Sequence, residues 1–144
     1  MATFNKFNAF VADVANKVHN LGADTLKVML TNTAPAAANA VKTDITEIAA
    51  GNGYTAGGTQ ATPVSSSQTG GTYALKINNV TYTATPGSIG PFRYCVLYNS
   101  TPAGGNLIGW YDYGTNLTVT AATASRCNST PPTASCSSSD GQAL

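Results

Sequence analysis

The spacing of apolar residues along the chain changes once, just after residue 20. Up to that point they recur every three or four positions, which is the period of one face of an α-helix. The residues on this stripe are Phe4, Phe7, Phe10, Val11, Val14 and Val18. The pattern predicts one amphipathic helix over residues 3–20, with Thr3 as its N-cap and Gly22 just beyond its end.

From residue 25 onward the period becomes two, which is typical of β-strands. Residues 25–31 place Leu26, Val28 and Leu30 on one face. Six further segments, rich in Thr, Tyr and Val and separated by turn residues, are predicted as strands: 59–66, 72–78, 79–85, 91–98, 106–113 and 116–121. Many short strands at regular spacing favour an antiparallel β-sandwich or jelly roll. We therefore expect a single mainly β domain over residues 1–122, with one N-terminal amphipathic α-helix.

Two details of strand pairing follow from the same pattern. Residues 92–98 are apolar on both faces, so we expect them to form a central strand with 107–111 beside it. Asn78 and Asn79 predict a tight hairpin, because asparagine tolerates a positive φ.

The segment 32–58 is long, loop-like and rich in glycine. Thr43 or Asp44 is placed to cap a single helical turn over residues 45–49. Long loops in compact domains tend to be functional. We expect this loop to grip a neighbouring molecule.

Residues 123–144 break the strand pattern and form a Ser/Thr/Pro/Cys-rich tail, which composition alone would class as disordered. The genetic code allows another explanation. Starting from the third base of the Ala122 codon, suitable synonymous codons produce the sequence DGESLQLDAANGVLQLI followed by a stop. This sequence has a DGE turn, an alternating strand, an NG turn and a short final strand. We therefore hypothesise that the tail is a frameshifted final hairpin. Density for well-fitted prolines at Pro131 and Pro132 would count against it.

Charge is scarce and nearly balanced. Only 9% of the residues are charged, seven Lys or Arg against six Asp or Glu, whereas a typical soluble domain has about 25%. There is no basic excess to bind nucleic acid. We find no run of 18 apolar residues that predicts a membrane span and no pattern of a signal peptide. Since a charge-poor surface tends to associate, we expect much of this surface to be covered by a partner.

Residues with catalytic or metal-binding chemistry are few. His19, the only histidine, is expected to be partly exposed at a helix end rather than catalytic. Asp44 and Glu47 are interpreted as charges that cap a helical turn, and no second carboxylate pairs with Asp112 in the pattern. No nucleophile elbow, phosphate loop or zinc-ligand spacing occurs. We expect no enzyme activity, no cofactor and no catalytic, cofactor-binding or metal site.

The cysteines and aromatic residues fit structural roles. Cys95 lies in an apolar run and is predicted as a core residue, and an odd number of cysteines, three, argues against a disulfide framework. Five aromatic residues of the later strands could form a sugar-binding platform, but their strand spacing favours the core or a subunit interface. They are Tyr94, Tyr98, Trp110, Tyr111 and Tyr113.

Three parts of the sequence resemble a family of small virion proteins of tailed bacteriophages. They are MATFNKFNAFVADVANKVHNLGADTLKVMLTNTAP, TDITEIAAGNGYTAGG, and GPFRYCVLYN with LIGWYDYG, so the resemblance spans roughly residues 1–120. In those genomes such proteins accompany the gene for the major capsid protein. The resemblance implies a capsid decoration (cement) protein, which binds the outer surface of the major capsid protein shell and stabilises it. Family members usually finish with a DGE-type turn and a final strand, which the alternate frame restores.

The same resemblance implies the partners and the location. The partners are the major capsid protein and further copies of this chain, as a dimer or trimer, with no nucleic acid and no membrane. The location is the capsid surface of the virion, after synthesis in the host bacterial cytoplasm. We expect the N-terminal helix and the loop 32–58 to make the contacts. The alternative is a tail, neck or fibre component with an adhesion role, and an enzyme or sugar-binding module is the least favoured reading.

Overall fold

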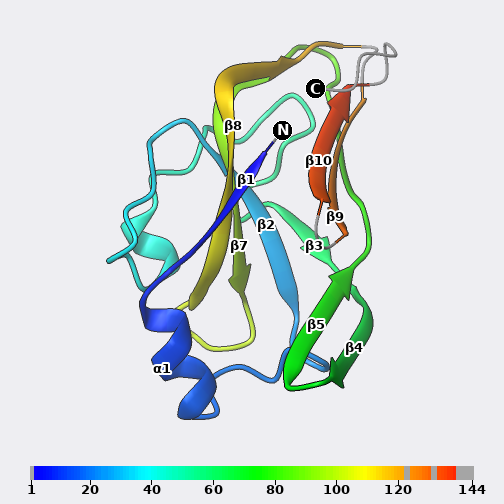
Figure 1. The fold of residues 1–144 in the computed structure, drawn as a ribbon. Coiled ribbons are helices and arrows are strands. Elements are labelled where there is room, and N and C mark those ends of the chain that lie inside the picture. The colour runs from blue at the N-terminus through cyan, green and yellow to red at the C-terminus, as the bar shows by residue number, and fades with distance from the viewer. Residues whose placement is uncertain (1, 122–123, 131–132, 139–144) are drawn as a thin grey trace.

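The computed structural model describes residues 2–121, 124–130 and 133–138, and over this range the chain is mainly β with antiparallel sheets and one α-helix (Figure 1). The elements in order are β1 (Thr3–Lys6), α1 (Ala9–Ala15), β2 (Leu26–Thr31), a 3₁₀ turn (Lys42–Asp44), β3 (Thr59–Ala61), β4 (Pro63–Thr69), β5 (Thr72–Ile77), β6 (Val80–Thr83), β7 (Ile89–Asn99), β8 (Leu107–Val119), β9 (Ala124–Thr130) and β10 (Thr133–Ser138). The predicted fold class is confirmed as mainly β, consistent with a β-sandwich, while the jelly-roll connectivity is not confirmed.

A five-stranded sheet with the order β1-β8-β7-β2-β3 forms one side of the molecule. Its centre is β7, whose residues from Tyr94 to Asn99 are all buried. The prediction of a central strand over 92–98 with 107–111 beside it is confirmed, because β7 pairs with β8 through Cys95 opposite Tyr111 and Val96 opposite Trp110. The predicted core position of Cys95 is confirmed as well.

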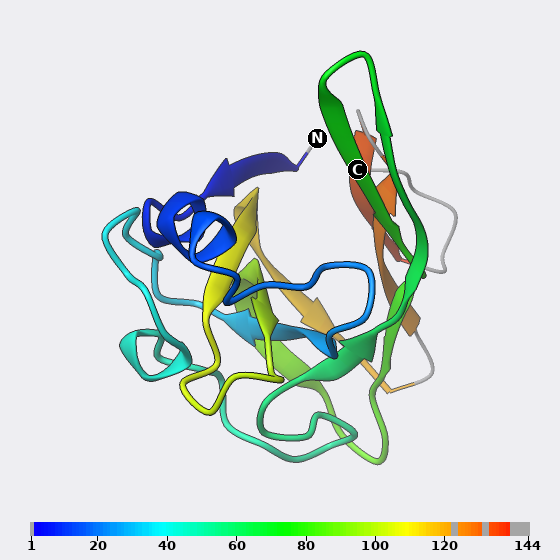
Figure 2. The same cartoon turned by 90° about the horizontal axis from the view of Figure 1, so that it is seen from below.

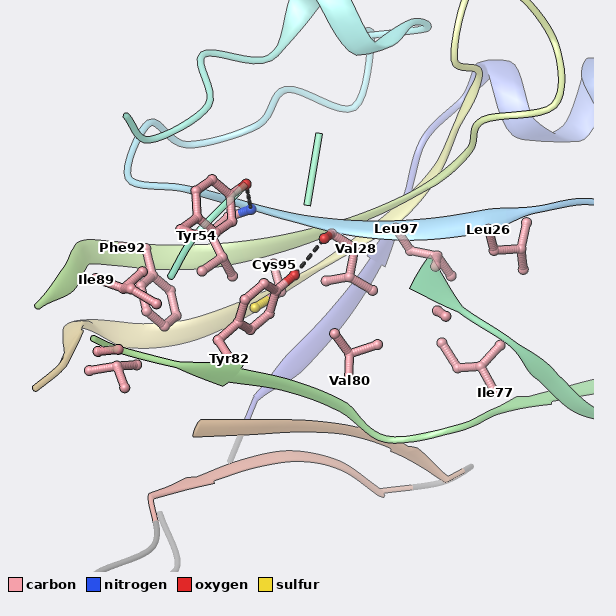
Figure 3. Close-up of a cluster of buried hydrophobic side chains, with 14 of the residues drawn as sticks. Leu26, Val28, Tyr54, Ile77, Val80, Tyr82, Ile89, Phe92, Cys95 and Leu97 are labelled. Atoms are coloured by element: carbon pink, nitrogen blue, oxygen red, sulfur yellow. Dashed lines mark hydrogen bonds between the residues drawn. The ribbon is translucent and has the colours of Figure 1, made fainter. Parts of the chain in front are cut away.

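A three-stranded sheet, β10-β9-β6, and the two-stranded hairpin β4–β5 lie on the other side (Figures 1 and 2). The main core fills the space between β6 and the face of β2 and β7 that carries Val28 and Cys95 (Figure 3). A second, smaller core lies on the opposite face of the five-stranded sheet. It consists of Phe7, Met29, Val96, Tyr98 and Leu107, with Ile45 of the loop 32–58 packed against it.

The predicted helix over residues 3–20 is wrong at both ends. Residues 3–6 form β1, which pairs with β8 from Thr3 opposite Asp112 to Lys6 opposite Gly109. Gly109 permits this pairing, because a Cβ there would collide with the ring of Phe4. The helix α1 covers only Ala9–Ala15, and Lys17 already has a φ of 61°. The periodicity therefore combined residues of a strand with residues of a helix, since Phe4 belongs to β1 and Phe7 lies before α1.

The predicted hairpin at Asn78 and Asn79 is also wrong, because β5 pairs with β4 and β6 pairs with β9. Asn78 instead makes two hydrogen bonds with Thr62. Its backbone N–H donates to the Thr62 carbonyl at 2.9 Å, and its Oδ1 accepts from the Thr62 N–H at 2.5 Å. The chain thus crosses from one sheet to another at this point. Gly70 and Gly71 form the turn between β4 and β5.

Three further boundaries differ from the predictions. The strand predicted over 59–66 is divided at Thr62 into β3 and β4. The two strands predicted over 106–113 and 116–121 are one strand, β8, which continues through Gly114. The helical turn expected over 45–49 is absent among the described residues, and the only turn nearby is the 3₁₀ turn at Lys42–Asp44.

The segment predicted as an anomalous tail contains the antiparallel pair β9 and β10. Residues 131–132 and 139–144 lie outside the described residues, and with them Pro131 and Pro132. The frameshift hypothesis therefore stays a prediction.

Candidate functional site

The helix α1 presents an apolar face to solvent. Val11 is 56% exposed and Val14 is 46% exposed. Ala12 and Ala15 on the same helix are exposed too. The inward face carries Phe10, which packs against the main core, and Asp13, the only charged residue of the helix. The exposed face of α1 therefore has no charge of its own.

A run of exposed alanines lies beside the start of this helix. The Asn8 N–H donates to the Ala37 carbonyl at 2.9 Å, which joins the beginning of α1 to the loop 32–58 (Figure 2). Ala36, Ala37 and Ala38 are exposed, and no charged residue occurs between positions 32 and 41. We call the exposed residues of α1 and these alanines together the α1 surface: Val11, Ala12, Val14, Ala15 and Ala36–Ala38. The two elements predicted to make contacts are thus neighbours in the fold.

Hydrogen bonds hold the loop 32–58 against the edge of the five-stranded sheet. The strand β3 pairs only with Leu26–Val28 of β2, which leaves the rest of that edge without a strand neighbour. Loop residues take its place: the Ile48 N–H donates to the Leu30 carbonyl at 3.0 Å, and the Leu30 N–H donates to the Tyr54 hydroxyl at 3.0 Å. The loop is therefore an ordered part of the scaffold.

Glu47 occupies the centre of this attachment rather than the expected helix cap. Its Oε1 accepts from the Gly57 N–H at 2.6 Å and from the Tyr54 hydroxyl. Burial and then the Glu47 hydrogen bond raise the pKa of Tyr54 far above its ordinary value, so the hydroxyl stays protonated and able to donate. The interpretation of Asp44 is nearer the structure, because its carboxylate accepts from the Ala40 and Val41 N–H groups at the 3₁₀ turn.

Close backbone approach fixes the end of the loop. Gly58 has a φ of 74°, and a Cβ on it would lie 1.8 Å from the Val28 carbonyl oxygen. Only glycine fits where the chain turns into β3 against β2. The neighbouring Tyr98 hydroxyl donates to the Gly57 carbonyl at 2.7 Å.

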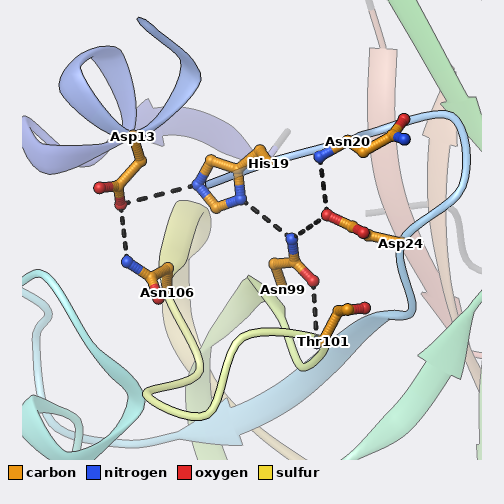
Figure 4. A network of polar contacts seen from close by, with 7 residues as sticks. All are labelled: Asp13, His19, Asn20, Asp24, Asn99, Thr101 and Asn106. Atoms are coloured by element: carbon orange, nitrogen blue, oxygen red, sulfur yellow. Dashed lines mark hydrogen bonds and ion pairs between the residues drawn. The ribbon is translucent and has the colours of Figure 1, made fainter. Parts of the chain in front are cut away.

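His19 is buried, which corrects the expectation of a partly exposed histidine at a helix end (Figure 4). It follows the helix by four residues and turns its ring inward, 5.3 Å from the Phe10 ring. The Asn99 amide lies 3.1 Å from His19 Nδ1, and Asp13 Oδ2 lies 3.7 Å from His19 Nε2. Desolvation lowers the pKa of His19, while Asp13 and Asp24 act in the opposite direction.

Asp112 pairs with a cation rather than with a carboxylate. Its two oxygens accept from Arg93 Nε at 2.8 Å and from Arg93 Nη2 at 3.1 Å. The Arg93 hydrogen bond lowers the pKa of Asp112. This pair joins neighbouring strands of the sheet and leaves no acid for a glycosidase-type pair at Asp112.

The five aromatic residues do not form one platform. Trp110 and Tyr98 belong to the smaller core, where the Trp110 ring lies 4.5 Å from the Phe7 ring. Tyr111 and Tyr113 pack against the main core on the opposite face of the sheet. Their alternation along β8 therefore divides them between the two sides.

Residues of the types that bind metal ions are scattered over the described part of the chain. Within it, no three His, Cys, Asp or Glu residues come together in a way that could hold a metal ion. No described helix is long and apolar enough to cross a membrane.

Sequence reasoning missed the polar network around His19, which brings together residues up to 93 positions apart, such as Asp13 and Asn106. The available signal was weak: a lone histidine after a helix, and Asn99 at the end of an apolar strand.

Comparisons with known proteins identify no family for this chain: no family model, no curated protein and no solved structure matches it.

Proposed function

We propose that this chain is a bacteriophage structural protein, a capsid decoration (cement) protein that binds the outer surface of the major capsid protein shell and stabilises it. The observation that carries the proposal is the α1 surface, an uncharged apolar face on an ordered β-scaffold. Its exposed valines lie on a helix and its alanines on a loop that is fastened to the sheet. The sequence resemblance to small phage virion proteins supplies the identity of the partner.

The physics of such a contact suits a protein that cements a shell. Covering Val11 and Val14 removes apolar area from water, at about 25 cal/mol per Å². The α1 surface carries no charge that would have to be desolvated. Many copies on one shell act together, so each contact can be modest. Association of the chain with itself as a dimer or trimer belongs to the same proposal.

The test is binding to empty shells of the phage that encodes the chain, measured with Val14→Asp and Val11→Asp. Each variant should bind at least about tenfold more weakly, because it places a carboxylate in an apolar contact. The matched control is Val64→Asp on β4, which changes an equally exposed valine (62%) outside the α1 surface. Shells with the wild-type chain should break at a higher temperature than bare shells. Equal breaking temperatures would overturn the cementing role.

The hairpin β4–β5 is the observation that favours the alternative, a tail, neck or fibre component with an adhesion role. It projects from the body, and Val64 and Tyr73 on it are exposed (Figure 2). The two functions make opposite predictions for the same variants. If Val64→Asp abolishes attachment to the particle or to host cells while Val14→Asp has no effect, adhesion replaces decoration. The number of copies per particle gives a second criterion, hundreds for a decoration protein and a dozen or fewer for a tail component.

A further inference from the structure

The connection from α1 to β2 is held by a partly buried network of five polar side chains, of which His19 and Asn99 are buried (Figure 4). Its members are Asp13 on α1, His19 and Asp24 in the connection, Asn99 at the end of β7 and Asn106 just before β8. The His19 side chain is 0% exposed. The helix itself has only seven residues and no side-chain N-cap, so contacts outside the helix must hold it in place.

The orientation of Asn99 determines the proton state of His19. Asn99 Oδ1 accepts from the Thr101 N–H at 3.0 Å, which directs its NH₂ group away from Thr101. That NH₂ group donates to Asp24 Oδ2 at 2.5 Å and to His19 Nδ1 at 3.1 Å. Nδ1 must therefore be an acceptor, and the single proton of the ring lies on Nε2.

A second proton on His19 has no place in this arrangement. It would sit on Nδ1 and meet the Asn99 NH₂ group, donor against donor. Relieving that clash requires Asn99 to turn its amide, which gives up the hydrogen bonds to Thr101 and Asp24. On the other side of the ring, Nε2 has no hydrogen-bond partner within the described residues, and Asp13 Oδ2, 3.7 Å away, is engaged by Asn106 Nδ2 at 2.9 Å.

We propose that His19 is an acid-sensitive latch on α1: neutral, it holds the helix and the connection to β2 against the ends of β7 and β8, and protonation releases them. The charged groups that face the ring are Asp13 from α1 and Asp24 from the connection, while β7 and the chain before β8 contribute the uncharged Asn99 and Asn106. The Asp13 and Asp24 carboxylates favour a protonated ring. The Asn99 NH₂ group that faces Nδ1 and the burial of the ring disfavour it.

The direction of the pH effect follows from proton linkage. A histidine released to water takes up a proton near pH 6.5, whereas the latched ring remains neutral to lower pH. The latched state is therefore fully favoured above about pH 6.5 and loses ground as the pH falls below it. Because α1 carries Val11 and Val14, acid would also release the helical part of the α1 surface. This consequence for shell binding rests on the proposed function, but the latch does not.

The test is hydrogen exchange of the full chain at pH 7.5 and pH 5.0, with protection corrected for the intrinsic exchange rate. The reporting amides are Asn16, which donates to the Ala12 carbonyl, and Val18, which donates to the Asp13 carbonyl. Their protection should fall roughly tenfold or more at pH 5.0, as linkage allows for one proton over this range. The amides of Gly51 and Tyr54 bond to each other's carbonyls in the loop and should change far less. Unchanged protection at Asn16 and Val18 would overturn the latch.

Two variants separate the latch from general acid effects. His19→Asn keeps an acceptor near the Asn99 amide and cannot titrate, so its protection at Val18 should not depend on pH. If the tenfold fall persists in this variant, His19 is not the latch. The swap Asn99→Asp with Asp24→Asn places an acceptor opposite Nδ1 at constant net charge, so acid should now strengthen protection. The same fall as in the wild type would contradict the proposal.

Shell binding measured at the same two pH values distinguishes the latch from the function. Weaker binding at pH 5.0 in the wild type, but not in His19→Asn, supports both proposals. If α1 opens at pH 5.0 and binding to shells is unchanged, the latch stands and the α1 surface is not the contact.

Discussion

The five-stranded and three-stranded sheets cover the same main core from opposite sides. In the five-stranded sheet the core positions of β2 carry Leu26, Val28 and Leu30. In the three-stranded sheet, β6 contributes Val80 and Tyr82. Residues directly opposite each other in an antiparallel pair lie on the same face. The pairing of β6 with β9 therefore places positions 125 and 127, opposite Tyr82 and Val80, on the core face.

Alternation and the pairing of β9 with β10 extend this face to six positions. The residues there are Ser125, Cys127, Ser129, Ala134, Cys136 and Ser138. All six are small, and three are serines. A sheet that covers a core normally places large apolar residues on its inner face. The backbone register of β9 and β10 therefore places small residues at positions where a sheet that covers a core normally has large ones.

The hypothetical alternate reading frame would place larger apolar residues on this face. It places leucine at positions 127, 129, 136 and 138, all on the core face, and polar residues at 126, 128, 130, 133 and 137 on the other face. Three positions do not follow the rule, since the frame gives glutamate at 125, glycine at 134 and valine at 135, and its NG turn falls within β10. Because the frame depends on chosen synonymous codons, its agreement with the strand register is consistency with the hypothesis, which stays a prediction.

The largest predicted effect is on stability. A chain carrying the alternate-frame residues from position 123 should have a free energy of unfolding higher by on the order of 5 kcal/mol. The reason is that a fully buried leucine contributes roughly 1.5–3 kcal/mol, and the frame places four on the core face. Urea unfolding of the two chains measures the difference through the midpoint and the m-value.

The control uses the same number of leucines on the two faces of the hairpin. The inward set is Cys127→Leu, Ser129→Leu, Cys136→Leu and Ser138→Leu, and the outward set is Arg126→Leu, Asn128→Leu, Ser135→Leu and Ser137→Leu. The inward set should stabilise the chain and the outward set should not. Equal effects of both sets would contradict the register argument, and the mass of the C-terminal peptide of the protein from virions decides the frame directly.

The strands were predictable because the residues that each strand buries recur with a period of two in the local sequence. Leu26, Val28 and Leu30 recur at every second position, which places them on one face of an extended chain. The pairing of strands was less accessible. Asn78 has the sequence of a hairpin turn, but hydrogen bonds to Thr62, 16 residues earlier, determine where the chain goes. Long-range pairing of this kind leaves no local signal.

At the N-terminus, too, long-range strand pairing determines the local structure. Phe4 and Phe7 fit a helical stripe, yet pairing with β8 beside Gly109 makes the first of them part of a strand. With the helix shortened to seven residues, Val11 and Val14 turn outward and become the candidate contact surface. That the helix and the loop 32–58 make the contacts stays a prediction, and the outward face of the helix depends on tertiary structure.

The second prediction concerns the five-stranded sheet, at the edge of β2 to which the loop 32–58 is bonded. Tyr54→Phe should lower the free energy of unfolding by about 2 kcal/mol, because it removes both the acceptor of the Leu30 N–H and the donor to Glu47 in a buried site. Thermal and urea unfolding give the value. Tyr73→Phe is the matched control: its hydroxyl bonds Ser66 at 2.6 Å on an exposed hairpin, so its loss should be below about 0.5 kcal/mol. Similar losses in both variants would mean that the loop is not fastened through Tyr54.

The smallest predicted effect tests whether the two sheets separate. The Tyr82 hydroxyl on β6 donates to the Val28 carbonyl on β2 and so links the sheets (Figure 3). Tyr82→Phe should cost about 1 kcal/mol, the usual net value of one hydrogen bond. If the three-stranded sheet opens before the five-stranded sheet, hydrogen exchange should show the loss at Val80–Thr83, by about fivefold, and not at the central strand β7. Equal loss in both sheets would show that they unfold together.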